Sequence, residues 1–146
     1  MSFSYGKGIL LLALVPFFCF AKQPSFSGTW NIDLRSTEER KLHFECGAAT
    51  FELAQVGDKV SGNHYMSTPQ CGRINEGGEG TVKGIAVGNT AILVVTSGRN
   101  GAIVLGRARL KGDTLQWETT EEIRGGDPEG DSSLILSKGT LILLRN

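Results

Sequence analysis

The sequence predicts an all-β protein, an antiparallel meander that closes into a small up-and-down barrel of about eight strands. Three observations predict this fold. Apolar and polar residues alternate along almost every segment, as at Phe51 and Leu53, which is the two-residue period of a strand. Twenty glycines are spaced along the whole chain and mark turns. Strands joined in sequence by tight turns leave exposed edges unless the sheet closes on itself.

The expected strands lie between these turns. Asn100 and Gly101 give the strongest turn signal, because both residues tolerate the positive φ of a tight hairpin. Another turn is expected at Lys138 and Gly139, and one helical turn at 36–41, where a serine precedes two glutamates. The strands are expected at 28–34, 50–56, 60–66, 80–87, 90–96, 102–110, 114–121, 132–137 and 140–144.

The first 21 residues have the pattern of a secretory signal peptide. Lys7 gives the start one positive charge, 8–20 is mostly apolar, and Cys19 and Ala21 place small residues before a cut. The apolar run is too short for a permanent membrane-spanning helix. We therefore expect one domain, 22–146, that folds outside the cytoplasm, in a periplasm or after secretion. The alternative is a lipid-modified Cys19, although the residues before it are not small.

Charge and cysteine content narrow the function classes. Cleavage removes Lys7, so the mature chain has 15 acidic residues and one fewer basic residue, a slightly negative net charge. The strongly basic face of a nucleic-acid binder is therefore not expected. Cys46 and Cys71 remain, and an even pair in an exported protein predicts a disulfide rather than a redox site. If Val56 faces Val60, Cys46 faces position 70, and a bulge in the turn brings Cys71 within bridging distance.

Gly28, Thr29 and Trp30 open the first expected strand, and a meander follows them. This combination resembles the calycin superfamily, which includes lipocalins and avidins, antiparallel barrels that hold a small ligand inside. The resemblance implies that Trp30 plugs one barrel end beneath Arg145 of the last strand. The opening is most similar to avidins, but Ile32 stands where they have asparagine, and the later tryptophans of a biotin site are absent. We expect barrel kinship without biotin binding.

Small residues on two expected strands affect how much space is left inside the barrel. Gly84 and Ala86 share one face of their strand, and Gly106 and Ala108 share one face of theirs. If these residues point inward, they leave room for one ligand. Alternatively, they accommodate a large neighbour such as Trp117.

Two classes of function follow, and the sequence favours the first slightly. The first is a non-enzymatic barrel that binds a small apolar ligand, with Tyr65 and Trp117 near its mouth, because aromatic rings combine contact area with a polar group. The second is a protein-binding barrel, similar to exported inhibitors, that acts through rim loops carrying Arg73 and Arg99. A filled interior with ordered rim loops would favour the second. No nucleophile motif predicts an enzyme, and no cofactor is expected.

The remaining features have structural interpretations. His43 and His64 are the only histidines, and the expected register does not bring them together, so no metal site is expected. The acidic residues within 118–131 predict a long solvated loop, because their spacing does not match a calcium-binding EF-hand. The run 141–144 is apolar on both faces, and its outer side is a candidate contact with a second subunit.

Overall fold

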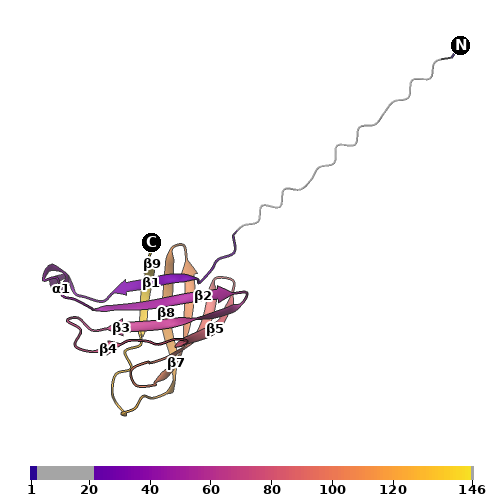
Figure 1. Cartoon of the computed structure of the whole chain (residues 1–146). Coiled ribbons are helices and arrows are strands. Elements are labelled where there is room, and N and C mark those ends of the chain that lie inside the picture. The colour runs from indigo at the N-terminus through magenta and orange to yellow at the C-terminus, as the bar shows by residue number, and fades with distance from the viewer. Residues whose placement is uncertain (3–21, 146) are drawn as a thin grey trace.

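The computed structural model describes residues 1–2 and 22–145, and the expected signal peptide lies outside the described residues except for its first two. The chain forms a closed antiparallel barrel of eight strands with one extra strand, which confirms the predicted fold class (Figure 1). Each barrel strand pairs with the next along the chain, except that β3 pairs with β5. Pairing of β1 with β9 closes the barrel, and β4 pairs with the end of β3. The elements are β1 (Gly28–Asp33), α1 (Thr37–Lys41), β2 (Ala48–Val56), β3 (Lys59–Ser67), β4 (Ile74–Asn75), β5 (Val82–Val87), β6 (Thr90–Thr96), β7 (Ile103–Lys111), β8 (Thr114–Arg124) and β9 (Lys138–Leu143).

The two ends of the barrel differ in their connections. Three two-residue turns contain Gly57, Gly88 and Gly112, all at positive φ, and they join β2 to β3, β5 to β6 and β7 to β8. Connections alternate between ends in an up-and-down barrel, so these turns share one end. The longer connections lie at the other end. Three of them, 68–81, 97–102 and 125–137, are called the rim below.

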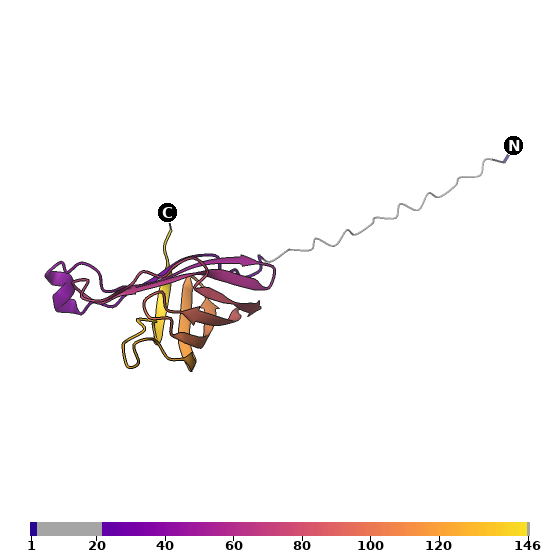
Figure 2. The same cartoon turned by 60° about the horizontal axis from the view of Figure 1, so that its bottom comes forward.

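An arm extends from the side of the barrel. Figure 2 shows α1 at the far end of this arm, beyond the rest of the barrel, next to one end of the β2–β3 pair. The helix has the predicted cap: the Ser36 hydroxyl accepts a hydrogen bond from the backbone of Glu39, and the Glu39 carboxylate accepts one from the backbone of Ser36.

Large side chains are packed in the interior. Phe51, His64 and Trp117 are each at most 1% exposed, and the Phe51 ring centroid lies 4.4 Å from that of His64 and 5.1 Å from that of Trp117. Gly106 lies against this cluster, and a β-carbon added there would overlap the Trp117 ring. At Gly106, therefore, a small residue accommodates a large neighbour, which was the alternative interpretation of the small residues.

Trp30 is buried close to the end with the tight turns. It is 2% exposed, and its indole N–H donates a hydrogen bond to the carbonyl of Phe26 at 2.8 Å. Arg145, which was expected above Trp30, forms an ion pair with Asp113, and its side chain is 73% exposed. Burial of Trp30 was expected, and Phe26 supplies its polar contact.

The disulfide between Cys46 and Cys71 is confirmed, but the predicted hairpin register was wrong by one residue. Val56 pairs with Lys59 rather than Val60, because the turn contains two residues instead of three. Cys46 accordingly faces Pro69. A turn after Pro69, with Cys71 at positive φ, brings the two cysteine α-carbons to 5.2 Å.

Two further expectations were wrong. Residues 132–137 form no strand, and β9 includes Lys138 and Gly139, where a turn was expected. By contrast, the turn expected at Asn100 and Gly101 is present, with Gly101 at positive φ, and the Ser97 amide closes this connection by donating to the Ala102 carbonyl at 2.8 Å. Among the described residues, no helix is long and apolar enough to cross a bilayer.

Candidate functional site

Buried side chains attach residues 132–137 to the barrel. The His64 Nε2 accepts a hydrogen bond from the Leu136 amide at 3.1 Å, and the Trp117 indole donates one to the Leu136 carbonyl at 2.6 Å. Because His64 is on β3 and Trp117 on β8, the segment reaches across the barrel. These contacts satisfy the backbone polar groups of Leu136, which explains why no strand ladder forms there.

The charge state of His64 follows from its surroundings. Its Nδ1 lies 3.0 Å from the Thr50 carbonyl, which can only accept, so Nδ1 carries the proton and Nε2 is free to accept. Burial lowers the pKa of His64 to about 4, partly offset by the hydrogen bond to Thr50. His64 is therefore neutral at pH 7, the form that its two contacts require.

Asn75 joins all three connections of the rim. It is fully buried, and its Oδ1 accepts hydrogen bonds from the amides of Gly77 at 3.0 Å and Gly98 at 3.1 Å. Its Nδ2 donates to the Leu134 carbonyl at 3.1 Å. One side chain on β4 thus holds 68–81, 97–102 and 125–137 together.

Ser97 and Gly98 bring the rim connections into direct contact. The Ser97 hydroxyl, which is buried, donates to the Ser133 carbonyl at 2.7 Å and accepts from the Arg99 amide at 3.1 Å. A β-carbon on Gly98 would overlap the carbonyl of Gly77, so only glycine permits this approach. These contacts hold the three connections of the rim against one another.

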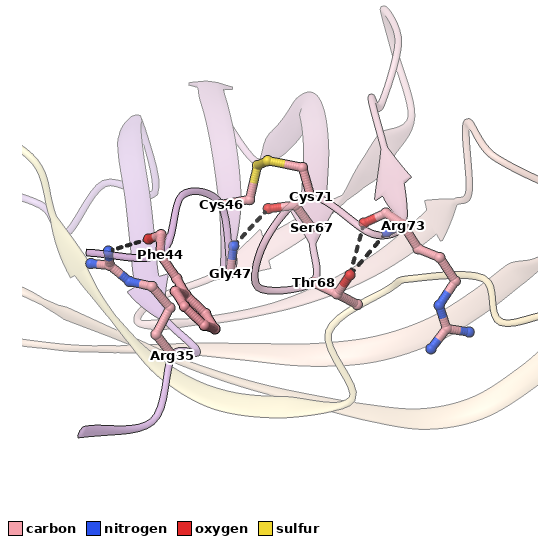
Figure 3. The surroundings of a disulfide bond; sticks show 8 residues. All are labelled: Arg35, Phe44, Cys46, Gly47, Ser67, Thr68, Cys71 and Arg73. Atoms are coloured by element: carbon pink, nitrogen blue, oxygen red, sulfur yellow. Dashed lines mark hydrogen bonds between the residues drawn. A yellow bond between two sulfur atoms is a disulfide. The ribbon is translucent and has the colours of Figure 1, made fainter. Parts of the chain in front are cut away.

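The two arginines predicted from the sequence come together on this surface. Arg73 and Arg99 line one shallow pocket, together with Ile74, Glu76 and neighbouring backbone. Arg99 forms an ion pair with Asp131 at 3.1 Å. Arg73 forms no ion pair within the described part of the chain, and its guanidinium points away from the disulfide (Figure 3).

The disulfide lies close to Arg73 in the chain and restrains the backbone there. Arg73 follows Cys71 by two residues, and its amide donates to the Thr68 hydroxyl at 2.9 Å (Figure 3). On the other side of the bridge, Arg35 donates to the Phe44 carbonyl at 2.9 Å. Arg35 also binds the carboxylate of Asp33 and so lowers the pKa of that carboxyl group to about 2.

Tyr65 and Trp117 lie on opposite sides of the barrel wall. Trp117 is inside, whereas Tyr65 is partly exposed and its hydroxyl donates to the Glu52 carboxylate on the outer face at 3.3 Å. The two residues expected at one mouth are thus separated.

On β9, Ile142 is 57% exposed and Leu141 is fully buried, so the last strand does carry apolar residues on both faces.

Sequence reasoning missed Asn75 and Ser97, the two buried polar residues that organise the rim. Both occur in the loops singled out for their arginines, each followed within two residues by a glycine. Asparagine and serine side chains often form hydrogen bonds with nearby backbone in such loops, and this was the signal in the sequence.

Comparison of the chain with family models, curated proteins and solved structures finds no match.

Proposed function

We propose that the protein is an exported, non-enzymatic barrel that binds another protein through its rim. The observation that carries this proposal is the buried hydrogen-bond network of Asn75 and Ser97 beneath the exposed Arg73 and Ile74. Loops held in one conformation lose little freedom on binding, so more of the contact energy becomes affinity. Recognition loops on a rigid scaffold commonly work in this way.

The rim also indicates the chemistry of its partner. Arg73 offers a guanidinium with no ion pair in the described residues, and Ile74 beside it is 40% exposed. Arginine next to an apolar contact is a common centre of binding energy in protein interfaces. The partner would place a carboxylate against Arg73 and an apolar side chain against Ile74.

The packing of the barrel interior supports the second class of function over the first. Phe51, His64 and Trp117 occupy this interior, and the segment that carries Leu136 reaches across one end, so the rim has the stronger support. Binding of a small apolar ligand inside stays a prediction. Native mass spectrometry of the protein from its host would test it by revealing any ligand that copurifies.

Two structural features support the proposed fold relationship and the proposed location of the protein. The closed eight-stranded barrel with Trp30 buried on its first strand supports a distant relationship to calycins. The Cys46–Cys71 disulfide supports folding outside the cytoplasm, because such bonds persist in oxidising compartments.

The rim proposal can be tested by site-specific photocrosslinking in the cells that produce the protein. A photoreactive residue at Ile74 should capture one defined partner. The control position is Val87, which is 79% exposed at the opposite end of the barrel and should not capture it. Equal capture from both positions, or none from Ile74, would contradict binding through the rim.

A further inference from the structure

The outer face of β7, β8 and β9 carries a second pocket, away from the rim. Two rows of side chains cross these strands in register: Arg107 faces Glu118, which faces Lys138, and Arg109 faces Gln116, which faces Thr140. These six residues line a pocket of about 320 Å³. Pairing of the three strands fixes the backbone positions from which these side chains project.

The pocket is strongly positive. Glu118 is its one carboxylate, and it forms ion pairs with both Arg107 and Lys138, each at 3.5 Å. Arg109 has no carboxylate within ion-pairing distance among residues 22–145. The pocket therefore contains three cations and one carboxylate, and residues 22–145 supply no counterion to Arg109.

The remaining groups suit an anion that offers several oxygens. Two guanidinium groups and one ammonium surround the pocket, and the Gln116 amide and the Thr140 hydroxyl supply neutral donors. The planar fork of arginine matches phosphate oxygens and binds them in pairs. The ion pairs of Glu118 are half exposed, so Arg107 and Lys138 can turn to an incoming anion at little cost.

We propose that this pocket, centred on Arg109, binds a phosphate group. The group is either a free phosphate or the headgroup of an anionic lipid, which share the same chemistry. The site lies on the barrel wall and uses no rim residue, so it stands or falls independently of the rim proposal.

The first test is a titration of isotope-labelled protein with inorganic phosphate at constant ionic strength. Saturable shifts are expected in the amide signals of Gln116 and Thr140. Arg109→Gln should weaken binding about tenfold or more, as expected for the loss of one charged hydrogen-bonding group. Lys83→Gln removes the same charge from an exposed position on β5, outside the pocket, and should change the affinity less than about twofold.

Glu118→Gln provides a test with the opposite sign. Removing the only carboxylate raises the positive charge of the pocket, so phosphate should bind more tightly. Arg109→Lys retains the positive charge but lacks the planar fork of arginine. Its affinity for phosphate should therefore lie between those of the wild type and Arg109→Gln. An equal loss of affinity in Lys83→Gln and Arg109→Gln, or no gain of affinity in Glu118→Gln, would overturn the site.

Vesicles distinguish the source of the phosphate. Cosedimentation with phosphatidylglycerol vesicles but not phosphatidylcholine vesicles, abolished by Arg109→Gln, would assign a lipid headgroup. Saturable binding of free phosphate without vesicle binding would assign a soluble ligand. If neither probe binds in an Arg109-dependent way, the proposal is wrong.

Discussion

The imidazole of His64 accepts a hydrogen bond from the backbone N–H of Leu136, 72 residues further along the chain, at 3.1 Å. The same ring donates to the Thr50 carbonyl from its other nitrogen. This pair of contacts joins the inner wall of the barrel to the segment that reaches across the rim end. Only the neutral imidazole can make both, because the protonated ring has no acceptor.

The first prediction concerns the pH dependence of stability. The unfolded chain binds a proton at His64 near the ordinary pKa of 6.5, whereas the folded chain binds it only near 4. The contribution is therefore fully present above pH 6.5 and is lost as the pH falls toward 4. The loss should reach roughly 3 kcal/mol, measured by urea unfolding at a series of pH values.

A matched pair of variants isolates this effect. His64→Leu should remove this part of the pH dependence, whereas His43→Gln, at an exposed loop position, should retain it. An unchanged slope in His64→Leu would show that another group is responsible.

The second prediction separates the framework of the rim from its contact surface. Asn75→Ala leaves two amides and a carbonyl without their buried partner, and it should lower the free energy of unfolding by about 1–3 kcal/mol. Arg73→Ala removes an exposed side chain and should change stability by less than about 0.5 kcal/mol. Chemical denaturation of both variants checks this difference, and equal losses would refute the division of roles.

The third prediction concerns the disulfide, whose cysteines are 25 residues apart. Replacing Cys46 and Cys71 by serine should cost about 3 kcal/mol, because the unfolded chain regains the freedom that the bridge removes. Urea unfolding of the double variant and of the reduced wild type should give similar values. Stability that is the same with and without the bridge would contradict its structural role.

The fourth prediction tests whether the interior is filled at Trp117. Gly106→Ala would place a methyl group in the indole ring and should destabilise the barrel by about 1–3 kcal/mol. Combining it with Trp117→Leu should cost less than the sum of the two single losses, because the smaller side chain leaves room. Thermal unfolding of the three variants gives this coupling, and simple additivity would mean that the two residues do not compete for space.

Local signals predicted much of the barrel. Alternation placed Phe51 and Leu53 on the buried face, and Ser36 marked the start of α1. The expected export and the cysteine count predicted the Cys46–Cys71 pairing. Each of these inferences depends on residues close together in sequence, or on a pair with no alternative.

Features set by distant contacts were not predictable in this way. The apolar run that contains Leu136 looked like a strand, but side chains of His64 and Trp117 satisfy its backbone instead. The hairpin register depended on one residue at the turn next to Gly57. At the rim, the arginines were visible in the sequence, but burial of Asn75 arises only when three connections meet.

The central claim is that the rim binds a protein partner through Arg73, and an affinity measurement tests it most directly. The partner identified by crosslinking would be purified. Isothermal titration calorimetry would then give its Kd for the wild type, for Arg73→Ala and for Lys59→Ala. Lys59 is an exposed residue next to the tight turn at the opposite end of the barrel. Loss of Arg73 should raise the Kd about tenfold or more, whereas loss of Lys59 should leave it within about twofold. Equal Kd values for the wild type and Arg73→Ala would contradict the claim.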